Sequence, residues 1–198
     1  MYTDGMMFSK QRCWRVCKIK KHMEHFNNTF SWTHPDILVD KALNGEYGVF
    51  AGNDIKSGEL LAVFGGYVFG IEEESDLPPS MSDNALQISE DLVLGIKSES
   101  DVEIASYFNH SCDPNAGFKG QVFLQSMRDI KKREQVTFDY GMVLFRSSKG
   151  VDYEFECLCG DENCRKVITN HDWKRPELQK KYNGYFQHYL EEKIKNQK

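Results

Sequence analysis

The sequence predicts a mainly β fold with short helices and an α-helical C-terminal tail. Between residues 37 and 96, short apolar runs alternate with Asn-Gly, Ser-Gly and Gly-Gly, the pairs that punctuate tight turns between strands. Apolar residues at helical spacing gather instead near the C-terminus. The 198 residues, 40% of them hydrophobic, can build a real core. One globular domain with accessory segments is therefore the expected organisation.

Six strand candidates occupy the first half of the chain. They are the apolar runs at residues 37–40, 48–55, 59–64, 67–71, 85–89 and 92–96. Two similar turns, I-K-S-G-E at residues 55–59 and I-K-K-R-E at residues 130–134, each precede an apolar strand. The β-rich part of the chain therefore extends into its second half.

Helix is expected at two places. Residues 101–108, D-V-E-I-A-S-Y-F, predict a short helix that enters a polar loop. In the tail, Asp172 suits an N-cap and Asn183-Gly184 suits a helix stop. The apolar stripe that follows consists of Phe186, Tyr189, Leu190 and Ile194. The tail therefore predicts two helices that pack one stripe on the β core.

Charge and hydropathy bound the partner classes. The formal net charge of −5 argues against nucleic-acid affinity from overall positive charge, and a basic partner such as a cationic peptide suits the chain better. Acidic residues gather at residues 72–76 and 90–103, a pattern that solvated loops also give. No apolar run approaches the roughly 20 residues of a membrane span, and the N-terminus lacks a signal-peptide pattern. We therefore expect an intracellular protein, cytoplasmic or nuclear, that is not secreted and does not contact membranes.

A basic arm runs from Lys10 to Lys21 without an acidic residue. It is the one segment suited to direct nucleic-acid binding, and a solvated extension is the alternative. Cys13, Cys17, His22 and His25 form a C-x3-C-x4-H-x2-H array, which offers four zinc ligands at a spacing that matches no finger signature. The sequence leaves the role of Cys13 and Cys17 open.

Three cysteines within eight residues predict a metal site. Cys157, Cys159 and Cys164 can wrap one ion, and tetrahedral structural zinc needs a fourth ligand. Cys112 is the remaining cysteine in the second half of the chain. An ion that bridged it to the other three would join regions 45 residues apart. Reduced, unligated thiols are the alternative.

Three ordered motifs carry the most specific signal. They are N-H-S-C-D-P-N at residues 109–115, V-T-F-D-Y-G at residues 136–141 and C-L-C-G-D-E-N-C-R at residues 157–165. Together they resemble the SET-domain protein lysine methyltransferases with a post-SET zinc segment, over roughly residues 37–167. The resemblance divides the chain into a basic N-terminal extension (1–34), a SET domain (35–148), a post-SET zinc segment (149–168) and a C-terminal helical tail (169–198).

The resemblance implies a SET β-clip fold in which the N-H-S-C and F-D-Y-G segments form a knot-like crossing. S-adenosylmethionine would lie on one face and the substrate lysine on the other, joined by a narrow channel. Tyr140 would be the catalytic tyrosine, and Phe138 would help to set how many methyl groups the channel admits. The implied activity is S-adenosylmethionine-dependent protein lysine N-methylation. The alternative is a catalytically silent SET-like module that binds a protein partner.

The resemblance also implies binding residues. Asn109 and His110 would contact the cofactor together with Glu46 and Tyr47, where E-Y-G-V replaces the usual G-x-G-V. Leu158 would help to cover the adenine. The implied structural zinc ligands are Cys112, Cys157, Cys159 and Cys164.

Two departures from the family pattern bear on the site. Phe64 in A-V-F-G-G stands where a tyrosine is common, which removes a hydroxyl from the neighbourhood of the lysine. No tryptophan follows closely after Arg165 to cover the adenine, since Trp173 lies eight residues on, and Val167 is a further candidate for that role.

The chemistry of methyl transfer needs position more than acid–base groups. A sulfonium methyl is already activated, so the protein must align a neutral amine with the S–CH3 bond. Lysine has an unperturbed pKa of about 10.4, and an aromatic, water-poor channel lowers that pKa because it disfavours the ammonium form. A tyrosine hydroxyl such as that of Tyr140 can then orient the amine. The target protein and the degree of methylation are left open.

Overall fold

The computed structural model describes residues 30–42, 45–74, 76–82, 84–146 and 152–197. The basic arm from Lys10 to Lys21 and the array of Cys13, Cys17, His22 and His25 lie outside these residues. Among the described helices, none has the length and apolar character that a membrane crossing requires.

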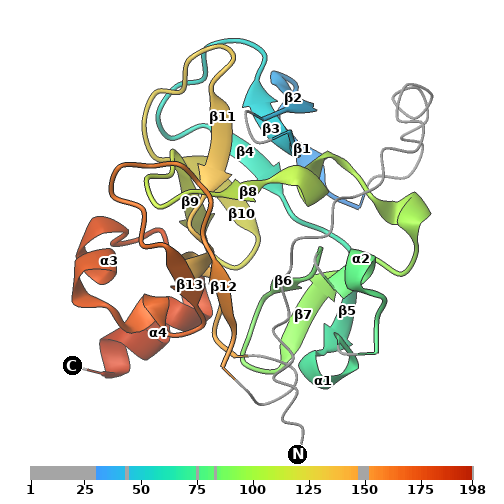
Figure 1. Ribbon diagram of the computed structural model, residues 1–198, viewed down its shortest axis with the longest axis vertical. Coiled ribbons are helices and arrows are strands. Elements are labelled where there is room, and N and C mark those ends of the chain that lie inside the picture. The colour runs from blue at the N-terminus through green and yellow to red at the C-terminus, as the bar shows by residue number, and fades with distance from the viewer. Residues whose placement is uncertain (1–29, 43–44, 75, 83, 147–151, 198) are drawn as a thin grey trace, which may run out of the picture.

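Two four-stranded sheets form the centre of the molecule (Figure 1). The first has the order β1-β4-β10-β9, with β1 at Trp32–Thr33, β4 at Leu60–Val63, β10 at Phe123–Ser126 and β9 at Ala116–Lys119. The second has the order β2-β3-β11-β8, with β2 at Ile37–Lys41, β3 at Tyr47–Ala51, β11 at Gln135–Phe138 and β8 at Asn109–His110. Among the described strands, only β8 and β11 pair in parallel.

Two smaller sheets complete the β structure. One has the order β5-β7-β6, with β5 at Tyr67–Gly70, β7 at Leu92–Gly95 and β6 at Leu86–Gln87. The other pairs β12 (Glu154–Glu156) with β13 (Val167–Thr169). Each of the six apolar runs predicted as strands overlaps one observed strand, from β2 to β7, so the predicted mainly β class is confirmed.

The helices are short. α1 (Ile71–Glu74) and α2 (Pro79–Ser82) lie beside the three-stranded sheet, whereas α3 (Pro176–Lys181) and α4 (His188–Asn196) lie on the opposite side of the molecule (Figure 1). The described residues also contain 3-10 turns at η2 (Glu99–Asp101), η3 (Ile104–Tyr107), η4 (Tyr140–Met142) and η5 (Asp172–Lys174).

The C-terminal tail packs into the central hydrophobic core. Tyr182 and Leu190 are fully buried, and Phe186 is almost so, in one cluster with core residues such as Phe118 and Val136. Burial of such aromatic side chains is a large source of hydrophobic stabilisation. The predicted packing of the tail on the β core is therefore confirmed.

Two helix predictions were wrong in detail. Residues 101–108 contain the 3-10 turn η3 and not an α-helix. At the start of η3, the Ser106 hydroxyl accepts a hydrogen bond from the Glu103 amide. Asp172 does not cap a long helix, because α3 begins only at Pro176, after the turn η5. The Asp172 carboxylate accepts hydrogen bonds from Arg165 and Thr169 instead.

Candidate active site and metal centre

A short parallel pairing brings the first two motifs together. Asn109 faces Thr137 and His110 faces Phe138 across β8 and β11. The buried side chain of Asn115 fixes this pairing, because its amide donates to the Gln135 carbonyl at 2.8 Å and its oxygen accepts from the Thr137 amide at 3.0 Å. The segments that the resemblance places in a knot-like crossing are thus direct neighbours.

Asn109 also reaches the turn at the start of β3. Its Nδ2 donates to the Tyr47 carbonyl at 2.9 Å, one residue after Glu46. A Cβ on Gly48 would lie 2.9 Å from that Nδ2 and would overlap the amide of Gln135. A larger residue at position 48 would therefore require the side-chain amides of Gln135 and Asn109 to shift. Three of the residues predicted to bind the cofactor, Glu46, Tyr47 and Asn109, meet at one place.

Tyr140 lies half-buried among aromatic rings. Its ring centroid is 5.2 Å from those of Phe138 and His110 and 6.1 Å from that of Phe155. Its hydroxyl donates to the Phe108 carbonyl at 3.4 Å. These contacts hold the phenol in an apolar surrounding with one polar partner at its tip.

Phe64 and Phe138 extend this aromatic surrounding inward. Phe138 is buried and meets Phe118 edge to face at 5.2 Å. Phe64 contacts Phe108 at 5.7 Å and Phe138 at 6.5 Å between centroids. The departure at position 64 therefore places an apolar ring, without a hydroxyl, against the residues around Tyr140.

His110 connects Tyr140 to the sulfur cluster. Its Nδ1 accepts from the Tyr140 amide at 3.1 Å, and its Nε2 lies 3.3 Å from Cys112 Sγ. Burial lowers the pKa of His110 to about 4, with a further contribution from the Arg165 guanidinium, although the Asp139 carboxylate opposes the shift. The imidazole is therefore neutral near pH 7, and because Nδ1 accepts, the proton lies on Nε2 and points at the sulfur.

A buried ionic network lies directly beside Tyr140. The Asp139 carboxylate is fully buried and accepts two bonds from Arg165, at 2.6 and 2.7 Å, and one from the Gly141 amide at 2.9 Å. Burial alone would raise the pKa of Asp139, but the guanidinium bonds hold that pKa below its usual value. Asp139 therefore remains ionised inside the protein.

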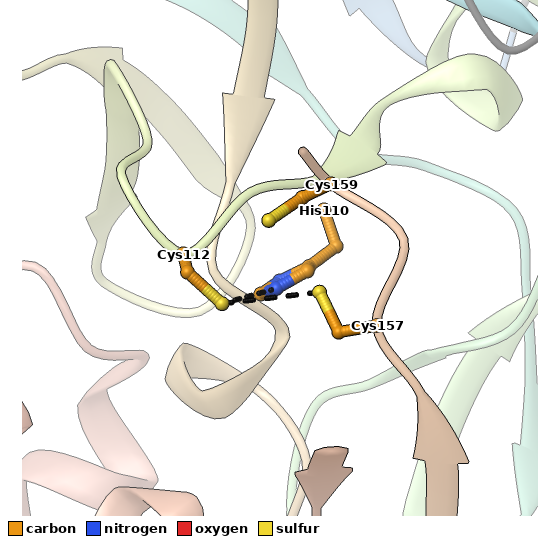
Figure 2. A group of neighbouring side chains, drawn as sticks. All are labelled: His110, Cys112, Cys157 and Cys159. Atoms are coloured by element: carbon orange, nitrogen blue, oxygen red, sulfur yellow. Dashed lines mark hydrogen bonds between the residues drawn. The ribbon is translucent and has the colours of Figure 1, made fainter. Parts of the chain in front are cut away.

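Four potential metal ligands converge next to this network (Figure 2). The ligand atoms of His110, Cys112, Cys157 and Cys159 all lie within 4.8 Å of one another. The sulfurs of Cys112 and Cys157 are 3.8 Å apart. Two thiolates on one tetrahedral zinc at about 2.3 Å each lie about 3.8 Å apart, so this spacing fits such an ion.

Cys164, the fourth predicted ligand, adjoins the same cluster. Its thiol donates to the Cys157 carbonyl at 3.6 Å. Burial opposes its ionisation, yet the pKa of Cys164 is lowered by the Lys166 amide and by bonds with the other three thiols. Burial raises the pKa of Cys112 to about 11 and that of Cys157 further still. Buried thiols of this kind would ionise together, as metal ligation requires, only beside a cation that offsets their charge.

The residues considered for the adenine cover differ in exposure. Leu158 is 57% exposed and Val167 is 38% exposed. Trp173 is buried and packs against Phe145, with ring centroids 5.6 Å apart. Trp173 is therefore a core residue, whereas Leu158 and Val167 keep accessible surface.

Sequence reasoning missed the ionic network. It assigned no chemistry to Asp139 and singled out neither Arg165 nor Tyr182. Tyr182 lies in the tail, 43 residues from Asp139, and its hydroxyl is 2.9 Å from the Asp139 carboxylate. The position of Arg165 directly after the last cysteine of the third motif was the one available signal.

The comparisons with known proteins agree with this geometry. The family model described as SET domain matches residues 46–141. The variant-silencing SET domain-containing protein of Plasmodium falciparum is 32% identical over 81% of this chain and 7% of its own length. The histone-lysine N-methyltransferase Su(var)3-9 of Drosophila melanogaster is 27% identical over 68% of this chain and 25% of its own length. The chain thus spans a quarter or less of these relatives.

A solved structure shows the same fold. The crystal structure of KRYPTONITE in complex with mCHG DNA and SAH superposes with a TM-score of 0.50 at 22% identity, covering 66% of this chain and 28% of that one. The motif order, the pairing of β8 with β11 and the family match at residues 46–141 lead to one conclusion. Residues 46–141 of the chain form a SET domain.

Proposed function

We propose that this chain is an S-adenosylmethionine-dependent protein lysine N-methyltransferase with a structural zinc ion. The observation that carries the proposal is the placement of the Tyr140 phenol, ringed by Phe138, His110 and Phe155, next to the junction of β8 and β11. The name of Su(var)3-9 as a histone-lysine N-methyltransferase and the SAH in the KRYPTONITE complex support it.

The cofactor side of the proposed site uses the junction of two turns. Asn109, already bonded to the Tyr47 carbonyl, and the backbone of His110 and Glu46 would bind S-adenosylmethionine. The exposed side chain of Leu158 would cover its adenine, since an apolar side chain at this exposure gains by contact with an apolar ligand. When bound, this cofactor supplies a methyl group that is already activated for transfer.

The lysine side uses the aromatic residues. Phe138, Phe64 and Phe108 exclude water and so favour the neutral amine over the ammonium. The Tyr140 hydroxyl donates to the Phe108 carbonyl, and a hydroxyl that donates one bond can also accept an N–H from the amine. Tyr140 would thereby aim the nitrogen lone pair at the methyl group. Phe138 would limit the space for methyl groups already added.

The proposed zinc ligands are Cys112, Cys157, Cys159 and Cys164. His110 competes for the fourth position by distance, but its Nδ1 accepts from the Tyr140 amide and its Nε2 proton points at Cys112. We therefore assign His110 the role of a donor to a ligand sulfur, an arrangement that commonly tunes metal sites. The ion would fasten the segment that carries Leu158 to the β8 loop.

The proposed substrate is a lysine in a basic peptide of an intracellular protein, such as a histone-like tail. The net charge of −5 and the acidic stretches favour a cationic partner. Direct nucleic-acid contact remains a separate proposal for the arm from Lys10 to Lys21, to be tested by salt-dependent binding of the intact and arm-deleted chains.

Incubation of the chain with labelled S-adenosylmethionine and basic proteins tests the main proposal. We expect label on lysine, and we expect Tyr140→Phe to abolish most transfer while cofactor binding in calorimetry persists. Tyr185→Phe, the same change in a tail residue whose ring contacts Lys119, is the matched control. Absence of both transfer and cofactor binding in the wild-type chain would favour the silent binding module.

A further inference from the structure

We propose that Tyr182, in the C-terminal tail, is a positioning residue that acts on Tyr140 through Asp139. This inference rests on the proposed function and extends it to a helix outside the region matched by the family model, residues 46–141. Tyr182 directly follows α3 and is fully buried.

The Tyr182 hydroxyl contacts two groups of the site at once. It lies 2.9 Å from Asp139 Oδ2 and 3.1 Å from the carbonyl of Cys112, so its one proton serves a carboxylate and a backbone acceptor. The bond to the ionised carboxylate is the stronger of the two. Lys181, the preceding residue, also donates to the Cys112 carbonyl at 2.9 Å and to Asp113 at 2.9 Å. The tail therefore bonds both Asp139 and the loop that contains Cys112 and Asp113.

Asp139 connects these bonds of the tail to Tyr140. Its Oδ1 accepts from the Gly141 amide at 2.9 Å and caps the turn η4, in which Tyr140 is the first residue. The Tyr140 amide is fixed on its other side by His110 Nδ1. Both peptide units that flank the catalytic residue are thus held by side chains, and the direction of its phenol follows from them.

Arg165 fixes the orientation of the same carboxylate. Its two terminal nitrogens bond both Asp139 oxygens, and its Nε donates to Asp172 at 3.1 Å. Its own amide donates to Cys112 Sγ at 3.4 Å. Arg165 thus holds both oxygens in a fork and Tyr182 adds a bond to Oδ2, and together they direct Oδ1 toward the Gly141 amide. The tail and the cysteine segment thus meet at Asp139.

The test compares Tyr182→Phe with Gln187→Met in the full chain. Tyr182→Phe removes one hydroxyl and keeps the buried ring. Gln187→Met removes another buried bond between tail and core, from Gln187 Nε2 to the Gln121 carbonyl at 2.7 Å, without contact to Asp139. Circular dichroism checks that both variants fold, and zinc analysis checks that both retain the metal.

We expect Tyr182→Phe to lower kcat by on the order of 10-fold to 100-fold, since small misplacement of a reacting group has effects of this size. The peptide KM and the cofactor Kd should stay at wild-type values, because Tyr182 touches neither ligand. The Gly141 amide resonance in glycine-labelled NMR spectra should move, because its acceptor Asp139 loses a donor. Gln187→Met should change neither kcat nor this resonance.

An unchanged kcat and Gly141 resonance in Tyr182→Phe would overturn the inference, as would an equal loss of kcat in Gln187→Met. The resonance requires no enzymatic activity. If the wild-type chain transferred no methyl group, the proposed function would fail, whereas the Gly141 shift would still decide whether Tyr182 controls the turn at Tyr140.

Discussion

Ile55 and Ile130 face each other in an isolated antiparallel bridge, and each donates its amide to the other's carbonyl at 2.9 Å. They are the first residues of the two similar turns, I-K-S-G-E and I-K-K-R-E. In both turns the amide after the isoleucine bonds the closing glutamate, Lys56 to Glu59 at 2.6 Å and Lys131 to Glu134 at 2.9 Å. The repeated pattern therefore marks two turns with the same hydrogen bonding, which pair with each other through Ile55 and Ile130.

Replacement of Arg133 by glycine should stabilise the protein. Arg133 has a φ of 71°, and its counterpart in the other turn, Gly58, has a φ of 87°. A left-handed conformation costs a residue with a side chain about 1–2 kcal/mol, while glycine costs about 0.4–1 kcal/mol in the unfolded chain. We expect Arg133→Gly to raise the free energy of unfolding by up to about 1 kcal/mol, measured by chemical denaturation.

The reciprocal change provides the control. A Cβ on Gly58 would meet no atom within 4 Å, so Gly58→Ala adds backbone strain without a steric clash. It should lower the free energy of unfolding by on the order of 1 kcal/mol. Equal effects of the two substitutions would show that φ does not decide stability in these turns.

The strands were predictable because their signals are local. Each apolar run in the first half of the chain is short and bounded by turn residues. The proximity of Cys112 to Cys157 and Cys159 was predictable because three closely spaced cysteines indicate a metal site that needs a further ligand.

The contacts between distant segments were not predictable. Nothing local in Tyr182 indicates that its hydroxyl meets Asp139, and nothing local in Asp172 distinguishes a helix cap from an acceptor for Arg165. From sequence, the Trp173 ring could have packed in the core or covered an adenine, and the structure buries it against Phe145 in the core. Tertiary packing makes such choices, and a single sequence does not encode them in its short-range pattern.

Stability should fall as pH rises through the titration of Glu103. The Glu103 side chain is buried, and its carboxylate accepts a hydrogen bond from the Ser31 amide at 3.0 Å. Burial raises the pKa of Glu103 above its usual value of 4.5, although bonds from Ser31 and Phe30 oppose the shift. The folded state therefore binds its proton more tightly than the unfolded state, and this stabilisation, complete below pH 4.5, is lost as pH rises through the folded pKa.

Glu103→Gln should remove this dependence. The amide keeps an oxygen for the Ser31 bond and carries no charge. Denaturation midpoints of the two proteins, followed from pH 4.5 upwards, should shift in favour of the variant as pH increases. Glu99→Gln, at an exposed position in the neighbouring turn η2, is the control and should leave the wild-type slope unchanged. A parallel course of wild-type and Glu103→Gln curves would contradict the assignment.

Phe138→Tyr should lower the number of methyl groups added to each lysine. Phe138 is buried against Phe118, and a hydroxyl on its ring would need a partner in an apolar region. The substrate amine is the partner that the proposed site offers, and this bond would hold the nitrogen and occupy space needed by a second methyl group. Mass spectrometry of a methylated peptide would measure the product distribution.

Phe64→Tyr gives an independent test of the same wall. The Phe64 ring contacts Phe108 and Phe138, so a hydroxyl at this position would enter the same aromatic region from the connection between β4 and β5. We expect a shift toward monomethylated product in this variant too. Unchanged products in both variants would mean that these rings do not line the lysine site.

Metal removal should loosen the cysteine segment without unfolding the β core. Zinc binding at structural sites is worth on the order of 10 kcal/mol, but the central core of this chain contains neither Cys112 nor the other cluster cysteines. A strong chelator should therefore lower the unfolding temperature, preserve most of the far-ultraviolet circular dichroism, and make four additional thiols reactive, those of Cys112, Cys157, Cys159 and Cys164.

The choice between Cys164 and His110 as the fourth ligand decides how this metal relates to catalysis. We expect Cys164→Ser to reduce the zinc content of purified protein strongly, because a ligand is lost. His110→Ala should keep the zinc, since its Nδ1 is committed to the Tyr140 amide and its Nε2 proton to Cys112. The opposite result would make His110 a ligand, and Tyr140 would then be bonded directly to a metal-bound imidazole.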